Sequence, residues 1–459
     1  MDEQYDVIIV GGGLGGLVAA HLLLKERNNL KIQVLETSDR LCGPLKTIEL
    51  EAAKGKDYFD IGVSRVGSAH PLMLALLQEL GIETYTLDDS GTKHWQLPDG
   101  KIKTYEGDIP PVAYTALIDF GFYSKKIDKL AKNLDLKCLA ATENCSELDD
   151  TTMDQFIERS LKTQGGKDMA RTMIGTFCGV PPDQLSLLLY LFMIRSCGNW
   201  DNHIGGEGID LLFKGGCQQL AERLQEKVGN DKITTGDAVT QIEQSDNMTR
   251  ATVYTQSGRE LETKFVILTI PGSDVSKIEL APPLDLPHQL PTAEYGVQFV
   301  ITYKKNFWRE KKMAGEFLSM AATLGSFKDE KKYPIVLFAD STSANGNPAL
   351  SGVFGSPCFA EMTSDERKQI AVDFIASVLG DEARDIIEYR DERECRSCWN
   401  TESVTMDPGL KTSEIMDSLL IPHGCIHFAG EETGAVWSGS MESTVEASNR
   451  VVKEVLGLL

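Results

Sequence analysis

Six consecutive residues near the N-terminus, five of them glycine, match a phosphate-binding turn. They read Gly11-Gly12-Gly13-Leu14-Gly15-Gly16, directly after an apolar run over 7–10 and before a helical pattern over 17–25. In such a GxGxxG pattern the first glycine permits a tight turn, the second lets the backbone approach a pyrophosphate, and the third allows close helix–strand packing. The amides at the helix N-terminus would face phosphate oxygens. The candidate binding residues in this turn are Gly11, Gly13, Leu14, Gly15 and Gly16.

A carboxylate follows at the spacing that this turn requires. Glu36 comes twenty residues after Gly16, at the end of a second apolar run over 32–35, where it can accept both ribose hydroxyls of an adenosine. A glycine-rich turn without a ligand is the alternative, but several glycines in a row cost backbone stability with no packing return. The unit therefore predicts a site for the ADP half of a dinucleotide, and it does not separate FAD from NAD.

Length, charge and cysteine usage exclude several classes of function. With 459 residues the chain is long enough for two or more packed units. Its 46 basic and 68 acidic side chains give a net charge of −22, which disfavours nucleic acid as a partner. The ten cysteines contain one CxxC pair, Cys395 and Cys398, and the seven histidines show no metal-ligand spacing. We therefore expect free thiols and no metal.

Neither the first residues nor the longest apolar stretch predicts a membrane association. The start MDEQYDVIIV lacks the basic segment and the long apolar stretch of a secretory signal. The longest apolar stretch, Leu185–Ile194, has ten residues, whereas a bilayer span needs about twenty. We expect a soluble, cytoplasmic protein without a membrane partner.

Apolar periodicity predicts the elements that would position these residues. Strands are expected over 7–10, 32–35, 239–242, 252–255, 265–270, 294–303, 315–322, 334–339 and 426–429. Helices are expected over 17–25, 71–80, 116–133, 151–163, 183–195 and 365–379, and from Met441 onwards. The long mixed stretch over about 86–204 predicts a separate, partly helical lobe.

A second motif lies in the C-terminal segment. His427-Phe-Ala-Gly-Glu-Glu-Thr433 and Trp437-Ser-Gly-Ser-Met-Glu-Ser-Thr-Val-Glu-Ala447 resemble the C-terminal signature of the flavin amine oxidase superfamily, which holds monoamine, polyamine and L-amino-acid oxidases. The resemblance covers most of the chain, including 36–43, 59–62, 80–84, 265–271 and 303–308. It implies FAD as the cofactor.

The resemblance also implies a fold. We expect an α/β protein with a Rossmann-like, doubly wound FAD-binding domain and a mixed α+β substrate domain inserted into it. The expected FAD-binding domain is assembled from residues 1–85, 205–285 and 410–459, and the expected substrate domain, with its helical lobe, from 86–204 and 286–409. The flavin would lie at their interface.

Several residues of the flavin end are carried over from the resemblance. Gly430 would let the backbone pass the ribityl chain, Glu431 would contact a phosphate or a ribityl hydroxyl, and Met441 would open a helix whose N-terminus stabilises negative charge on the reduced ring. Beyond the glycine turn and Glu36, the expected cofactor-binding residues are Arg40, Ser64, Val239, Gly430, Glu431 and Met441.

The chain departs from the family pattern at the flavin. The usual Gly-Gly-Arg reads Cys42-Gly43-Pro44, which leaves Arg40 or Lys46 as a replacement for the pyrophosphate-binding arginine. Gln298 stands where the family has a lysine near flavin N5, and a neutral side chain cannot act as a point charge there. We therefore expect slower reaction of the reduced flavin with oxygen.

The aromatic cage of monoamine oxidases is also missing. Ser440 replaces one tyrosine of the cage, and the segment from Trp399 to Gly409 is short and offers neither the second tyrosine nor the cysteine that tethers their flavin. FAD is therefore expected to bind noncovalently. The candidate catalytic residues are Arg65, Gln298, Trp399 and Ser440.

Arg65 points to a class of substrate. It stands where L-amino-acid oxidases carry an arginine that pairs with the substrate carboxylate, and a guanidinium fork suits a carboxylate better than a cationic amine. The alternative is that Arg65 pairs with a neighbouring carboxylate or with FAD itself.

The expected reaction is removal of hydride from a carbon bearing an amine, giving an imine, with an amine or amino acid as the substrate and oxygen or another acceptor for reoxidation. Two alternatives stay open. One is an FAD-dependent dehydrogenase or desaturase that does not use oxygen, and the other is a flavin-binding protein that has lost turnover. A homodimer is compatible with the sequence.

Overall fold

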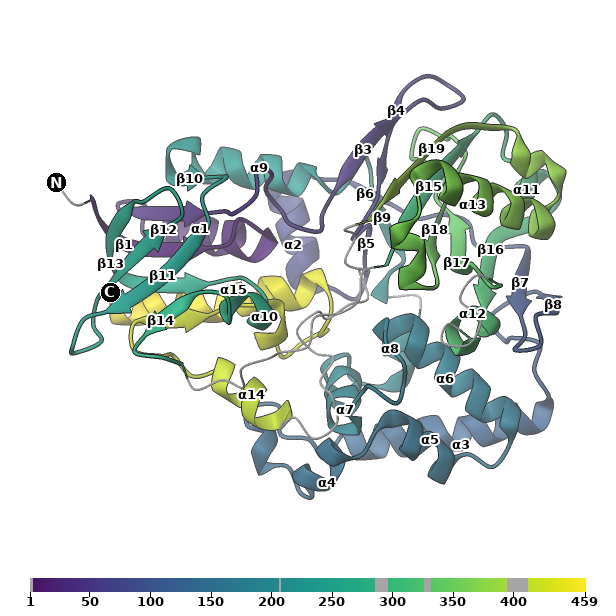
Figure 1. Cartoon of the computed structure of the whole chain (residues 1–459), viewed down its shortest axis with the longest axis horizontal. Coiled ribbons are helices and arrows are strands. Elements are labelled where there is room, and N and C mark those ends of the chain that lie inside the picture. Colours follow the sequence, from purple (N-terminus) through teal and green to yellow (C-terminus); the bar gives the residue numbers. More distant parts are fainter. Residues whose placement is uncertain (1–2, 206–207, 285–295, 326–331, 394–411) are drawn as a thin grey trace.

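The computed structural model describes residues 3–205, 208–284, 296–325, 332–393 and 412–459. Two large sheets lie at opposite ends of the long axis, and a group of helices lies beside the second sheet (Figure 1). Both chain termini lie at the outer end of the first sheet. The elements between the two sheets therefore decide what can be held there.

The first sheet has eight strands, in the order β10-β2-β1-β13-β12-β11-β14, with β20 paired to β13. Their bounds are β1 Glu3–Val10, β2 Ile32–Leu35, β10 Ile233–Thr234, β11 Val239–Gln244, β12 Ala251–Thr255, β13 Glu260–Leu268, β14 Glu279–Ala281 and β20 Ile426–Phe428. β1 runs parallel to both β2 and β13. Val7, Ile8 and Ile9 are fully buried, as expected for parallel strands that are covered on both faces.

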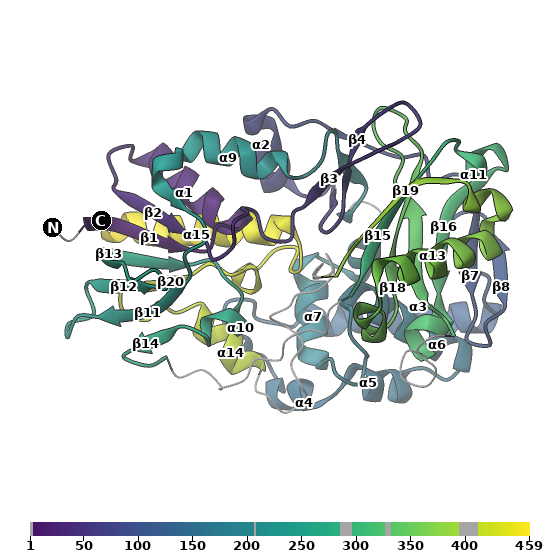
Figure 2. The same ribbon diagram turned by 45° about the horizontal axis from the view of Figure 1, so that its top comes forward.

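Helices cover the two faces of this sheet. Val7 and Ile9 pack with α1 (Leu14–Glu26) and α15 (Met441–Leu458), whereas Ile8 and Val10 pack with α14 (Thr412–Leu419). This division follows from the alternation of side chains along a strand. Two further helices join α1 and α15 in one apolar cluster: α2 Pro71–Leu80 and α9 Gln219–Val228. Figure 2 shows α2 and α9 of this layer above the strands.

The second sheet has seven strands, in the order β19-β15-β18-β17-β16-β7-β8. Their bounds are β7 Thr92–Gln96, β8 Ile102–Tyr105, β15 Gln298–Tyr303, β16 Met313–Ser319, β17 Ile335–Asp340, β18 Ala349–Phe354 and β19 Ile386–Glu392. α11 (Phe307–Glu310) and α13 (Ser364–Leu379) share an apolar cluster with this sheet. Two small sheets, β3-β4 and β5-β9-β6, comprise β3 Thr47–Leu50, β4 Asp57–Asp60, β5 Arg65–Val66, β6 Thr84–Tyr85 and β9 Leu211–Phe213.

The helices that follow β8 form a helical lobe with one apolar core. It consists of α3 Tyr114–Ala131, α4 Cys145–Asp150, α5 Met153–Ser160, α6 Gln164–Cys178, α7 Leu187–Ser196 and α8 Trp200–Ile204. The sequence did not predict α6, because Gly165, Gly166 and Gly175 weaken its helical signal. The strand predicted over 315–322 is wrong at its end, because β16 stops at Ser319 and α12 (Met320–Gly325) follows. Throughout the described part of the chain, the helices are too short or too polar to cross a membrane.

A buried ion pair joins α13 to β19. The Nε and Nη2 atoms of Arg367 donate to the Asp391 carboxylate at 2.6 and 3.1 Å, and Nη1 donates to the carbonyl oxygens of Phe359 and Met362. Burial by itself would raise the pKa of Asp391, but the hydrogen bonds from Arg367 and Tyr389 lower it overall. Because β19 pairs with β15 at Gln298, this clamp also holds the edge of the sheet that faces the cavity.

We expect Arg367→Met to destabilise the fold by about 3–5 kcal/mol, because it leaves a buried carboxylate without its cation. Since the pKa of Asp391 is lowered in the folded state, this stabilisation is present at neutral pH and is lost as the pH falls through the lowered pKa. Urea unfolding at pH 7 measures the change. Lys304→Met breaks an exposed pair with Asp385 and serves as the control, with an expected loss under about 1 kcal/mol. Equal losses in both variants would contradict the prediction.

Candidate functional site

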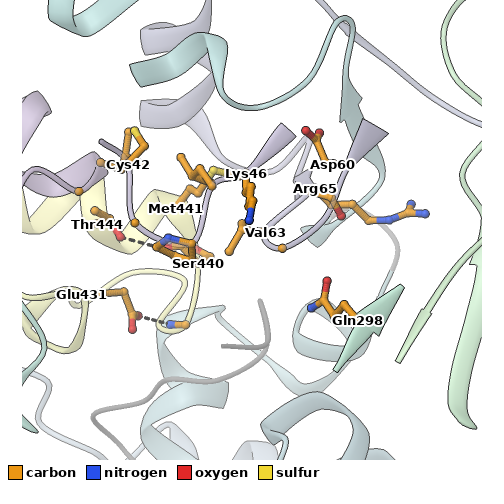
Figure 3. A pocket seen from close by; sticks show the side chains of 18 of the residues that line it. Cys42, Lys46, Asp60, Val63, Arg65, Gln298, Glu431, Ser440, Met441 and Thr444 are labelled. Carbon is orange, nitrogen blue, oxygen red and sulfur yellow. Dashed lines mark hydrogen bonds between the residues drawn. The ribbon is translucent and has the colours of Figure 1, made fainter. Parts of the chain in front are cut away.

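A cavity of about 1140 Å³ has lining residues from the first sheet, the second sheet and the helical lobe. One end is formed by the turn after β1 and by Glu36, and the other by residues of β15, β17, α6 and α7. Figure 3 shows the labelled side chains around it, with Gln298 across the cavity from Ser440 and Met441. The cavity therefore connects the glycine turn of the first sheet with the second sheet and the helical lobe.

The glycine turn forms one end of the cavity. Gly11 has a φ of 106°, and a Cβ atom on Gly16 would lie 1.9 Å from the Gly11 carbonyl oxygen, so both positions require glycine. A Cβ atom on Gly13 would meet nothing within 4 Å, and Gly13 lines the cavity. Gly13 also precedes α1 and makes no side-chain cap, which leaves helix N-terminal amides for a ligand. This open cradle fits a pyrophosphate.

Glu36 is held in place beside this turn. One carboxylate oxygen accepts from the Gly12 amide at 2.6 Å, and the other accepts from the Ser38 amide and hydroxyl at 2.8 and 2.7 Å. Carboxylate oxygens have further lone pairs, so two ribose hydroxyls can still donate to them. The arrangement fits the adenosine ribose of a dinucleotide, as the sequence predicts.

The two candidate replacements for the missing pyrophosphate arginine have different surroundings. Arg40 donates to the carbonyl oxygens of Leu45, Leu41 and Gly43, so it orders the loop that follows Glu36. Lys46 forms an ion pair with Glu392 at the end of β19. Both cations line the cavity, and both have described protein partners.

Asp60 is a buried carboxyl group at the wall of the same cavity. It accepts hydrogen bonds from the Thr47 hydroxyl at 2.6 Å and the Cys217 amide at 2.9 Å. Burial raises the pKa of Asp60 to about 6 despite these hydrogen bonds. The group therefore joins β4 to β3 and to the segment just before α9.

The C-terminal motif directs a helix N-terminus at the cavity. Ser440 caps α15 by accepting from the Ser443 amide at 3.4 Å, and its hydroxyl donates to the Trp437 carbonyl oxygen at 2.6 Å. The Glu431 carboxylate accepts from the Gly439 amide. Met441 and Thr444, in the first turn of α15, line the cavity. The positive end of this 18-residue helix therefore faces the cavity.

Gln298 and Arg65 lie at the other end. Gln298 is the first residue of β15, is 8% exposed, and lies opposite Glu392 on β19 and Val353 on β18. Arg65 Nη1 donates to the Ile209 carbonyl oxygen at 3.5 Å, and Figure 3 shows the side chain extending away from Met441. Trp399 lies outside the described residues.

The structure brings most of the candidates together. Those that line the cavity are Gly11, Gly13, Leu14, Gly15, Glu36, Arg40, Ser64, Arg65, Gln298, Glu431, Ser440 and Met441. Gly16, Val239 and Gly430 are not among the described lining residues. Gly16 acts through the close packing with Gly11, and Val239 lies in β11 opposite Thr255.

Two aromatic groups of the lining were not predicted. The rings of His70 and Trp437 contact edge to face, with 4.7 Å between centroids. His70 Nδ1 accepts from the Gly67 amide at 3.1 Å, and burial lowers the pKa of His70 to about 4, so its ring is neutral at pH 7. No local pattern links residues so far apart in the chain. Within the described residues, no group of three or more metal-ligating side chains is arranged around an ion site.

A family model described as flavin containing amine oxidoreductase matches residues 14–456. The chain belongs to this family. It is 32% identical to the probable flavin-containing monoamine oxidase A of Dictyostelium discoideum, over 99% of this chain and 98% of that protein. It is 30% identical to the flavin-containing amine oxidase A of Bos taurus, over 100% of this chain and 86% of that protein.

Solved structures of the same fold include putrescine oxidase with bound putrescine and a cyclohexylamine oxidase from Brevibacterium oxydans. The TM-scores are 0.86 and 0.85, with 23% and 22% identity, and at least 99% of each chain is covered in both comparisons. The predicted superfamily, the α/β fold with a Rossmann-like FAD-binding unit, and the assignment as an FAD-dependent oxidoreductase are confirmed. The open cradle at Gly13 and the fixed Glu36 carboxylate fit the ADP half of FAD.

The contrast between two glycines gives a test of this site. We expect Gly13→Ala to fold normally but to bind FAD at least tenfold more weakly, because its new methyl group enters the open cradle and meets only the cofactor. We expect Gly16→Ala to lower the stability of the apoprotein itself, because its methyl group collides with the Gly11 carbonyl. Flavin absorbance per protein and the melting temperature of the apoprotein separate the two effects. Normal FAD affinity in Gly13→Ala would contradict the placement of the pyrophosphate.

Proposed function

We propose that the protein oxidises the carbon–nitrogen bond of an amine to an imine at the end of the cavity around Gln298. The observation that carries this proposal is the apolar part of the cavity lining, which includes Phe177, Met193, Ile209 and Leu337. Bound FAD would accept the hydride from the carbon that bears the nitrogen. The apolar side chains would orient a neutral amine and exclude water from the reacting carbon.

In this proposal the part of the chain with the first sheet binds FAD, and the part with the second sheet binds the substrate. Residues 1–85, 205–285 and 410–459 hold FAD, and residues 86–204 and 286–409 form the substrate side. Of the predicted residues, Glu36 holds the ribose, Gly13 and Gly15 face the pyrophosphate, and Met441 stands beside the flavin. The proposed site of action is the cytoplasm, in keeping with the acidic composition of the chain.

Arg65 motivates a second candidate, an amino acid. It lines the cavity and its guanidinium already donates to Ile209 O, so a substrate carboxylate would have to compete with or join that contact. The amine oxidase relatives favour the simple amine, since their names refer to amines. The two candidates differ in one chemical group, which makes them separable by matched substrates.

We expect 2-phenylethylamine to bleach the flavin absorbance in anaerobic mixing, and phenylalanine to do so at least tenfold more slowly. The reason is that the apolar wall gains nothing from a carboxylate, whose desolvation is costly. Faster bleaching by phenylalanine, with at least a tenfold loss in Arg65→Ala for phenylalanine only, would support the amino acid instead. No bleaching by either compound or by putrescine would favour a dehydrogenase of another bond.

We expect the side chain at position 298 to affect the rate at which oxygen reoxidises the reduced flavin. We expect stopped-flow reoxidation by oxygen to be slow in the parent and to accelerate at least tenfold in Gln298→Lys, because a buried ammonium would stabilise negative charge that develops on oxygen. Gln298→Ala is the matched control for loss of the amide. Unchanged rates in all three proteins, with unchanged flavin spectra, would show that this position does not govern reoxidation.

A further inference from the structure

Two residues that line the cavity, His70 and His203, each have a buried ring nitrogen, Nε2, without a hydrogen-bond partner among the described residues. A buried nitrogen that pairs with nothing costs free energy, so each of these atoms is a candidate for contact with a ligand. His70 packs against Trp437, three residues before the Ser440 cap of α15. His203 lies in a different part of the lining, and the proposed function does not yet use it.

His203 belongs to the wall that the helical lobe contributes to the cavity. Its ring contacts the Phe177 ring of α6, with 6.0 Å between centroids, and meets the Tyr190 ring of α7 edge to face at 5.7 Å. Phe177 and Met193, from the same two helices, also line the cavity. His203 therefore adds a polar group to the apolar part of the lining.

The short helix α8 holds His203 in this position. The Asn199 side chain caps the helix by accepting from the Asn202 amide at 2.8 Å. Trp200 is 1% exposed, and its amide donates to the Asp128 carboxylate of α3 at 2.7 Å. Because the helix is fixed in this way before any ligand arrives, little ordering of the segment has to accompany binding.

The His203 ring is neutral at pH 7, because burial lowers its pKa to about 4. A neutral imidazole carries one N–H group and one free lone pair. Nδ1 lies 4.0 Å from Cys197 Sγ, and burial raises the pKa of this thiol to about 12, so the sulfur keeps its proton. A thiol that donates to Nδ1 leaves the ring proton on Nε2, and a thiol that accepts from Nδ1 leaves the lone pair there.

A hydroxyl group fits Nε2 of His203 in either state. A hydroxyl both donates and accepts, so it can pair with this nitrogen whichever ring nitrogen carries the proton. An ammonium only donates and a carboxylate only accepts, so each of them fits one tautomer alone. Both would also bring a charge against an apolar wall, where the neutral ring offers no opposite charge. The chemistry of the site therefore favours a neutral hydroxyl.

We propose that His203 is a substrate-binding residue whose Nε2 pairs with a hydroxyl group on the amine. This proposal rests on the proposed amine oxidation and narrows its substrate class to hydroxylated amines. The carbon that bears the nitrogen would face the flavin, whereas His203 belongs to the helical lobe, so the hydroxyl is carried by another carbon. Phe177 and Met193 would contact the apolar part of the same substrate.

Matched amines test the role of His203. Tyramine and its meta isomer differ from 2-phenylethylamine by one ring hydroxyl, at two positions of the ring. We expect the better of these two isomers to exceed 2-phenylethylamine about tenfold in kcat/KM, and His203→Leu to bring this ratio to about one, because the hydroxyl then meets an apolar side chain. The ratio is taken within one preparation, so incomplete folding of a variant does not alter it.

Two further variants sharpen the comparison of the amines. His203→Gln keeps a donor and an acceptor and is expected to retain part of the preference for the hydroxylated amine. His70→Leu, at the other histidine with an unpartnered nitrogen, is the matched control and is expected to keep the ratio of the parent.

Binding without turnover separates this proposal from the proposed function. Calorimetry of the FAD-loaded protein with para-cresol, meta-cresol and toluene uses ligands without an amine. We expect one cresol to bind about tenfold more tightly than toluene in the parent, and equally in His203→Leu. That result without oxidation of any amine would contradict the amine assignment but not the hydroxyl contact.

Three outcomes would overturn the role of His203. The first is equal kcat/KM for the three phenylethylamines in the parent, and the second is an unchanged preference in His203→Leu. The third is a preference for the diamine putrescine that is lost in His203→Leu, which would assign an ammonium to Nε2 instead of a hydroxyl.

Discussion

The contact between the Gly11 carbonyl and the backbone of Gly16 is the constraint on which the site depends. Since a Cβ atom at position 16 would lie 1.9 Å from that oxygen, α1 can start immediately at the end of β1 only with glycine there. This start leaves the amides at the head of α1 directed at the cavity and brings Gly12 within 2.6 Å of Glu36. The phosphate cradle and the ribose carboxylate are therefore two results of one close packing.

A second helix N-terminus completes the cavity from the far end of the chain. α15 reaches it through the Ser440 cap, and the buried Glu442 carboxylate accepts from the Leu72 and Met73 amides at the head of α2. Burial raises the pKa of Glu442 although both amides lower it. Helix α15 is thus anchored to the N-terminal unit by a carboxylate that itself caps a helix.

The sequence patterns that depend on neighbours in the chain predicted the structure well. Strand β1, helix α2 and helix α13 agree with the apolar periodicity to within a few residues, since each buries one regular face. α6 was missed because its three glycines lower the local helical signal, although Thr163 caps it and its apolar face packs in the lobe. At 315–322 the periodicity of β16 continues into α12, where the Ser319 hydroxyl accepts from the Ala322 amide and turns the chain into a helix.

The sequence by itself determined the ADP-binding unit, the flavin family and the residues from Gly11 to Glu36 that serve it, because a turn, a helix and a carboxylate at fixed spacing are local features. The tertiary structure determined which groups the two nearby cations, Arg40 and Lys46, contact. Arg40 donates hydrogen bonds to carbonyl groups of its own loop. Lys46 forms an ion pair with Glu392, 346 residues away. The same holds for the environment of Gln298 and for the contact between His70 and Trp437. The Lys46 pair and the contacts of Gln298 and His70 join segments that are far apart in the chain, so no spacing along the chain encodes them.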